Sequence, residues 1–190
     1  MKKSKTKIPQ RQREQYRGVT LIARAFRSGV QGKAWCNGEE IASVESITEN
    51  SVIELLREHV DRSIVVETAE NATPYPAASK YALSLSRNRD KLTNKQLAML
   101  RAHRDAPNRI LSEESLTEAA ECKRWSSARS QYAILGRWLG ESMLFQPLDS
   151  AKNSPAWIRI VTYAAASKEG NSSGWELRAE LAEALDNLAI

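Results

Sequence analysis

Three capped helices are predicted by the stretch Leu92–Met143, LTNKQLAMLRAHRDAPNRILSEESLTEAAECKRWSSARSQYAILGRWLGESM. The first would begin after Thr93, because a glutamine follows at the capping-box spacing. The second would begin after Ser112, where two glutamates in the first turn complement the helix dipole. The third would follow Ser126 and Ser127. Its apolar residues recur every three or four positions, as on one side of a helix: Ala128, Tyr132, Leu135, Trp138, Leu139 and Met143.

The segment after the third helix is rich in β-branched and aromatic residues. Trp157–Ala166 predicts a strand, the polar, glycine-bearing Lys168–Gly174 a turn, and Trp175–Arg178 a second short strand. A terminal helix would follow, with an apolar side formed by Leu181, Ala182, Leu185 and Leu188. A short helix and a long helix, followed by two strands with a polar tip, resemble the winged helix-turn-helix DNA-binding domain. The resemblance covers roughly the C-terminal half of the chain.

This resemblance implies that the third helix meets a DNA groove. The residues that would face the groove are Ser126, Ser127, Arg129, Ser130, Ala133 and Arg137. Lys123 and Arg124 in the preceding turn, and Lys168 at the tip of the wing, would contact backbone phosphates. The alternative is that these are ordinary solvated charges on a helix that contacts another protein. The glutamates of the second helix do not favour DNA.

Composition predicts a globular protein with a buried core. The chain has 190 residues, of which 42% are hydrophobic and 27% charged, enough for one medium domain or two small ones. It contains no apolar run near the roughly 20 residues that span a bilayer. The basic N-terminus is not followed by an apolar segment, so a secretory signal is not expected. Cys36 and Cys122 lie far apart, which favours reduced thiols in the cytoplasm.

The net charge of +5 is unevenly distributed along the chain. Residues 1–17 hold seven of the 28 basic residues and only one acid, whereas the rest of the chain is nearly neutral. We therefore expect residues 1–17 to form a disordered basic arm. Such an arm would either contact phosphates or serve only as a solubilising tail, and the sequence leaves both open.

Residues 18–66 predict a compact βββα unit. Three strands are expected at Gly18–Phe26, Val30–Trp35 and Glu40–Ile47. Asn37-Gly38 predicts a type I′ hairpin, because both positions accept positive φ. Thr48 would cap a helix with an apolar stripe formed by Val52, Leu55, Leu56 and Val60. One helix covers one face of the sheet, so the other face must bind a partner or a ligand.

The start Tyr-Arg-Gly-Val and the βββα order resemble the small three-stranded DNA-reading domains of AP2-type and integrase arm-binding proteins. Such domains put a sheet face rich in Arg and Trp into the major groove. The resemblance implies that Arg24, Arg27, Lys33 and Trp35 contact DNA. The sequence lacks the further arginines of that pattern. A core position for Trp35, or a sheet that pairs with another protein, therefore remains an alternative.

Residues 67–91 are expected to form a linker between the two domains. Thr73-Pro74-Tyr75-Pro76 excludes a helix there and marks the boundary. A short strand at Ser63–Val66 and a further short element at Tyr81–Leu85 are expected on either side of it. The winged-helix domain would then comprise residues 92–190.

Catalytic motifs are weak in this sequence. His59 and His103 are the only histidines, and neither has a nearby cysteine or histidine with which to bind zinc. Glu121-Cys122-Lys123 matches the E-x-K element of one nuclease superfamily, but it falls in a predicted turn rather than on a strand. The phosphate-binding and dinucleotide-binding glycine motifs are absent. We expect no enzymatic activity, no cofactor and no metal.

The sequence therefore predicts an α+β protein with a βββα domain followed by a winged helix. Its expected function is non-enzymatic binding of double-stranded DNA in a bacterial or phage setting, with transcription regulation as the first expectation and a homodimer as one possible state. The alternative is a protein-binding accessory subunit or inhibitor of a nucleic-acid-processing or defence complex. A cytoplasmic location without membrane contact is expected in both cases.

Overall fold

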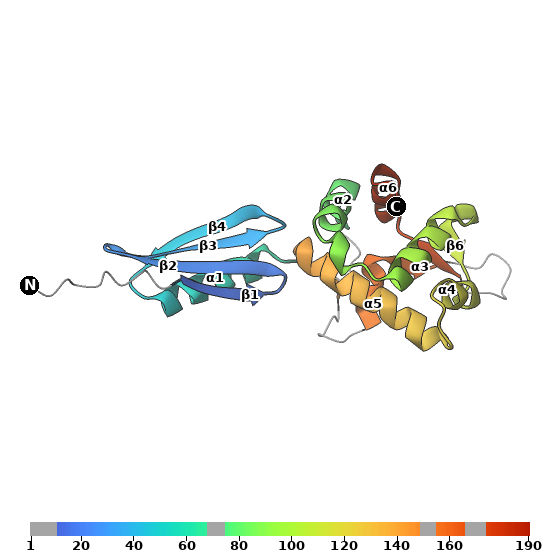
Figure 1. The fold of residues 1–190 in the computed structure, drawn as a ribbon, viewed down its shortest axis with the longest axis horizontal. Helices are drawn as coiled ribbons and strands as arrows, with labels where there is room; N and C mark the ends of the chain where they lie inside the picture. The colour runs from blue at the N-terminus through green and yellow to red at the C-terminus, as the bar shows by residue number, and fades with distance from the viewer. Residues whose placement is uncertain (1–10, 68–74, 149–154, 166–173) are drawn as a thin grey trace, which may run out of the picture. The chain divides into compact units, whose positions relative to one another are not determined.

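The computed structural model describes residues 11–67, 75–148, 155–165 and 174–190 (Figure 1). It is mixed α and β, with an antiparallel sheet as its largest strand assembly. The chain divides into two compact units, Met1–Ile64 and Val65–Ile190. The predicted βββα domain extends to residue 66, and the first unit ends at Ile64.

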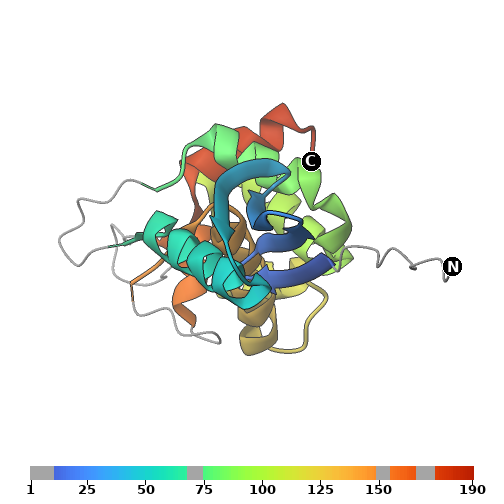
Figure 2. The same ribbon diagram turned by 90° about the vertical axis from the view of Figure 1, so that its left-hand side faces the viewer.

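Unit 1 is a four-stranded antiparallel meander with one helix. Its elements are β1 Arg11–Tyr16, β2 Val19–Phe26, β3 Gly29–Cys36, β4 Glu39–Ser46 and α1 Glu49–Ser63. The helix lies against one side of the strands (Figure 2). Its buried residues Val52, Ile53, Leu56 and Val60 pack on the buried residues of the sheet. The predicted stripe was wrong at Leu55, which is 39% exposed, because Ile53 takes the inward position.

The predicted turn and cap of unit 1 are confirmed. Asn37 and Gly38 have φ values of 48° and 77°, as a type I′ turn requires. The Ser51 amide donates a hydrogen bond of 3.2 Å to the Thr48 hydroxyl, which caps α1. At Gly32 on β3 a Cβ atom would overlap the Val52 side chain, so glycine allows the helix to approach the sheet closely.

The prediction that residues 1–17 form a disordered arm was wrong for residues 11–16. These residues form β1, which pairs with β2, while residues 1–10 lie outside the described part of the chain. No side chain of β1 is fully buried. Polar contacts hold β1 against α1 instead. Arg57 Nη2 lies 2.7 Å from Glu14 Oε1, and the Tyr16 hydroxyl donates a hydrogen bond of 3.0 Å to Asp61. Because the strand lacks alternating apolar residues, its sequence does not reveal it.

Unit 2 is mainly helical. Its α-helices are α2 Ala78–Arg87, α3 Asn94–Asp105, α4 Glu113–Ala119, α5 Trp125–Ser142 and α6 Ala179–Asn187. Its 3-10 helices are η1 Arg89–Lys91, η2 Pro107–Arg109 and η3 Pro155–Ile160. Its short strands are β5 Val65–Val66, β6 Ile110–Leu111, β7 Phe145–Gln146, β8 Thr162–Ala164 and β9 Trp175–Leu177. β5 pairs with β7 in parallel, and an antiparallel sheet has the order β6-β9-β8.

The three predicted helices of residues 92–143 are present. The capping box of α3 is complete, because the Gln96 amide donates to the Thr93 hydroxyl and the Gln96 side chain accepts from the Thr93 amide. Ser112 caps α4 by accepting from the Ser115 amide at 3.1 Å. The third helix begins slightly earlier than predicted, at Trp125, with Arg124 at its N-cap. Tyr132, Leu135 and Leu139 are buried, as the periodicity indicates, whereas Trp138 is only partly buried.

Two predicted elements of unit 2 were wrong. Residues 78–87 are not linker but α2, whose Tyr81 is fully buried and donates a hydrogen bond of 2.8 Å to the Ile160 carbonyl. Residues 157–160 are not strand but part of η3, and the strand that follows is only Thr162–Ala164. Trp157, Ile158 and Ile160 are apolar because they pack in the core, partly against α5, and not because they alternate across a sheet.

His103 is a buried packing residue of unit 2. Its Nε2 atom lies 2.6 Å from the Trp175 carbonyl and its Nδ1 atom 3.2 Å from the Tyr132 hydroxyl. Because a carbonyl only accepts, Nε2 carries the proton and Nδ1 accepts from Tyr132. Burial lowers the pKa of His103 below its ordinary value of 6.5. The ring therefore joins α3, α5 and β9 in its neutral form.

Unit 2 is expected to lose stability as the pH falls below about 6.5, because the unfolded chain then binds a proton at His103 that the folded chain excludes. The free energy of unfolding should fall by at most about 1.4 kcal/mol per pH unit from this group. Urea unfolding followed between pH 7.5 and 5 measures the slope. His103→Gln should flatten it, whereas Ser130→Ala, an exposed change in the same unit, should not. An equal slope in wild type and His103→Gln would contradict the assignment.

Candidate nucleic-acid interface

The sheet of unit 1 has one face that α1 does not cover, which we call the open face. Along β2 the residues Val19, Leu21 and Ala23 are buried under the helix, so the alternate residues point the other way. On β1, Glu14 and Tyr16 contact α1, so their neighbours share the open face. The strand register places the residues of the open face in three rows, each of which runs across β1, β2, β3 and β4. The rows are Arg11, Arg24, Gln31 and Glu45; Arg13, Ile22, Lys33 and Ser43; and Gln15, Thr20, Trp35 and Glu40.

Basic side chains dominate the β1 and β2 half of the open face. Arg11 and Arg24 are directly opposite each other in the β1–β2 ladder, and like charges in that position destabilise a sheet. Among the residues that the structure describes, no acid forms an ion pair with Arg11, Arg13 or Arg24. Lys33 differs, because its Nζ atom lies 2.6 Å from Glu40 Oε2. The open face therefore holds uncompensated positive charge on one side.

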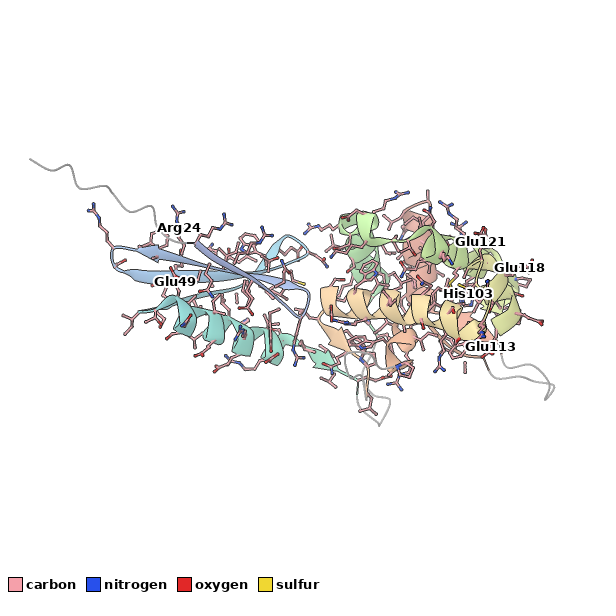
Figure 3. All side chains as sticks on the ribbon, turned by 60° about the horizontal axis from the view of Figure 1, so that its bottom comes forward. Arg24, Glu49, His103, Glu113, Glu118 and Glu121 are labelled. Carbon is pink, nitrogen blue, oxygen red and sulfur yellow. The ribbon has the colours of Figure 1, made fainter. Side chains whose placement is uncertain are left out.

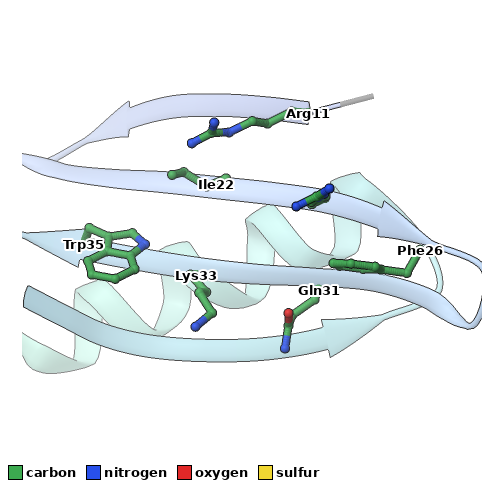
Figure 4. Close-up of a pocket in the computed structure, with 7 residues that line it drawn as sticks. Arg11, Ile22, Phe26, Gln31, Lys33 and Trp35 are labelled. Atoms are coloured by element: carbon green, nitrogen blue, oxygen red, sulfur yellow. The ribbon is translucent and has the colours of Figure 1, made fainter. Parts of the chain in front are cut away.

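A shallow hollow of about 600 Å³ lies on this face (Figure 4). It is lined by Arg11, Ile22, Arg24, Phe26, Gln31, Lys33 and Trp35. Phe26 and Trp35 lie toward its opposite ends, with Ile22 between them (Figure 4). The Arg24 guanidinium lies 5.3 Å from the centre of the Phe26 ring, and the Lys33 ammonium 5.9 Å from that of Trp35. Apolar surface and cations thus alternate in one concave site.

The other side of unit 1 has the opposite charge. The helix α1 carries four acids, Glu49, Glu54, Glu58 and Asp61, against the two bases Arg57 and Arg62. Figure 3 shows Arg24 on the sheet and Glu49 at the start of α1. A unit with a basic sheet face and an acidic helix will turn its sheet toward a polyanion.

The second candidate surface is the start of α5. Its predicted contact residues are exposed: Lys123, Arg124, Ser126, Ser127, Arg129 and Ser130. However, Glu113, Glu114, Glu118 and Glu121 are also exposed in and just after α4 (Figure 3). A depression of about 610 Å³ brings three of these glutamates together with Lys123 and Arg124. This surface has mixed charge and attracts phosphates less than the open face does.

Two further residues predicted for α5 and the wing are less suited to DNA or not described. Arg137 already forms an ion pair within α5, with its Nε atom 2.8 Å from Glu141 Oε1. Lys168 lies outside the described residues, together with most of the predicted wing tip. Ser130 donates its hydroxyl to the Ser126 carbonyl one turn earlier, although its oxygen can still accept.

The E-x-K triplet lies where the sequence predicts it. Glu121, Cys122 and Lys123 occupy the turn between α4 and α5, and Glu121 has a φ of 49°. No group of three or more possible metal ligands occurs within the described ranges. Cys36 is buried, and Cys122 is partly buried. The described residues therefore give the triplet no metal-binding partner.

Sequence reasoning found part of the open face and missed the rest. Arg24, Lys33 and Trp35 lie on it together, and Trp35 is partly buried there and not in the core under α1. Arg27 lies in the exposed β2–β3 turn. Arg11 and Arg13 were assigned to the arm, yet β1 places them on the open face. Because β1 lacks an apolar pattern, its sequence carries no signal for this position.

No helix among the described residues is long and apolar enough to cross a membrane. Comparisons with protein-family models, with curated proteins and with solved structures found no match.

Proposed function

We propose that this is a non-enzymatic DNA-binding protein whose main contact surface is the open face of unit 1. The observation that carries the proposal is the set of arginines Arg11, Arg13 and Arg24, which share one face without an acidic partner among the described residues. Their repulsion costs stability in the free protein. Phosphates would relieve it, and each neutralised phosphate releases condensed counterions into solution.

We further propose that unit 2 is a winged helix. Strand β6 lies between α3 and α4 and pairs with β9, which in turn pairs with β8. This order, together with a short α4 and a long α5, supports the winged-helix interpretation. Lys123, Arg124 and Arg129 would then add phosphate contacts beside a duplex, although three glutamates of α4 share a depression with Lys123 and Arg124. Regulation of transcription in a bacterium or phage is the biological role we favour.

The proposal is tested by fluorescence anisotropy on a labelled 25-base-pair duplex across a salt series. The full chain is compared with a chain that begins at Arg11, which keeps β1 and removes the four lysines before it. We expect the shortened chain to bind with a log–log salt slope of magnitude about 3 or more, because the three arginine–phosphate contacts of the open face remain. Loss of binding together with residues 1–10 would overturn the proposal, since the folded surface would then contribute nothing.

A protein-binding role for unit 2 is the second candidate. Ile134 on α5 is 57% exposed, and four exposed glutamates surround the start of the same helix. An exposed isoleucine on a helix whose start is next to acids suits a protein partner with a basic, apolar surface. Under this alternative, Ile134→Ala would weaken partner binding while the DNA affinity of the full chain stays unchanged.

A further inference from the structure

We propose that the open face binds single-stranded DNA, with unpaired bases stacked on Phe26 and Trp35. The inference rests on the proposed function, because it assumes that the open face contacts DNA, and it names the form of DNA. It starts from the hollow, which combines cations with apolar side chains. A surface that binds only phosphates needs the cations but not the aromatic rings.

The exposed aromatic residue is the first argument. Phe26 is 50% exposed on the open face, although burial of such a ring is worth about 1.5–3 kcal/mol. A duplex offers a protein its groove edges and its phosphates, while its base faces stay stacked inside the helix. Only an unpaired strand offers base faces, and stacking of a base on an aromatic ring contributes about 1–3 kcal/mol. Phe26 therefore has a suitable partner in single-stranded DNA.

The spacing of the two rings is the second argument. Trp35 is opposite Thr20 in the register, and Phe26 lies six residues further along β2. Six residues of a strand span about 20 Å, so the rings bound a linear site and not a pocket for one base. Because a stacked strand rises 3.4 Å per nucleotide, the site would hold about six stacked nucleotides or fewer extended ones. That length suits an oligonucleotide.

The residues between the rings complete the argument. Arg24 and Lys33 lie one row apart between Phe26 and Trp35, where the phosphates of a strand crossing the site would pass. The Arg24 guanidinium lies beside the Phe26 ring and offers a second flat surface for a base. The Gln31 amide lines the same hollow and can donate to and accept from a base edge. The groups for stacking, charge neutralisation and hydrogen bonding therefore lie along one line between the two rings.

The test uses the full chain and two labelled ligands, a mixed-sequence 15-nucleotide strand and its blunt duplex. We expect the single strand to bind at least about tenfold more tightly. Phe26→Ala and Phe26→Leu should each lower single-strand affinity about tenfold and duplex affinity less than twofold, whereas Phe26→Tyr should retain binding. Leu55→Ala, which removes a similarly exposed side chain from α1, is the matched control and should change neither. Circular dichroism confirms that each variant is folded.

A crosslinking experiment locates the contact directly. Irradiation of the complex with a 5-iodouracil-substituted strand should give adducts on the tryptic peptides that contain Phe26 or Trp35, read by mass spectrometry. Equal or tighter binding of the duplex, or an equal loss for both ligands in Phe26→Ala, would overturn the inference and leave the proposed function standing. If neither the single strand nor the duplex binds, both the inference and the proposed function are overturned.

Discussion

The triple variant Arg11→Gln, Arg13→Gln, Arg24→Gln is expected to bind a DNA duplex roughly 10²- to 10³-fold more weakly than the wild-type chain. Each arginine would form a charged hydrogen bond to a phosphate, worth about 1.5 kcal/mol, and tenfold in affinity corresponds to 1.4 kcal/mol. The log–log salt slope should fall in magnitude by about three, because three phosphate contacts are lost. Anisotropy at low salt, where binding is tightest, measures the affinity, and a salt series measures the slope.

The matched control is Arg62→Gln, Lys80→Gln, Arg101→Gln, which removes the same charge from exposed positions that do not belong to the open face. It should lower the affinity only a few-fold. An equal loss in both triple variants would mean that net charge, and not the open face, governs binding. The open-face variant should also be at least as heat-stable as wild type, because it removes the repulsion between Arg11 and Arg24. A merely structural role of these arginines would lower stability instead.

Local signals predicted much of the fold. Asn37-Gly38 and the Thr48, Thr93 and Ser112 caps are each determined by a few neighbouring residues, and the structure has all of them. The apolar period of α5 likewise depends only on its own sequence. These features are predictable because backbone geometry and side-chain hydrogen bonds act within one turn of the chain.

The errors have a different cause. β1 has no apolar pattern, because it is an edge strand whose inward residues are Glu14 and Tyr16 and whose partners on α1 lie more than forty residues away. η3 has a strand-like composition, because its apolar side chains are buried against a helix that precedes it in the chain. In both cases a tertiary contact decides the conformation, and propensity alone cannot reveal it.

In the candidate site, too, residues on locally predictable strands were found and residues placed by a tertiary contact were missed. Arg24 and Lys33 were predicted because they lie on strands that the sequence reveals. Arg11 and Arg13 were missed because their position depends on the register between β1 and β2. The predicted DNA surface on α5 remains a proposal. The sequence already showed the glutamates of the preceding helix, and the structure places three of them in one depression with Lys123 and Arg124.

Gly136→Ala is expected to destabilise unit 2 by about 3 kcal/mol or more. In an exposed helix interior the same change would stabilise the protein by up to about 1 kcal/mol, because alanine is the better helix former. Here a Cβ atom would overlap the carbonyl oxygen of Trp157 and lie 2.9 Å from its carbonyl carbon. Backbone atoms cannot rotate away as a side chain can, so α5 and η3 would have to separate, and overpacking of this kind costs 1–3 kcal/mol or more.

Urea unfolding followed by tryptophan fluorescence measures this effect, since Trp157 lies at the contact. Ser130→Ala, an exposed change on the same helix, is the matched control and should shift the stability by less than about 0.5 kcal/mol. A Gly136→Ala variant as stable as wild type would show that η3 is not packed against α5. Because β8 follows η3 directly in the chain, the contact of η3 with α5 also positions the antiparallel sheet of unit 2. A loss of stability at Gly136 therefore tests the packing on which the winged-helix proposal depends.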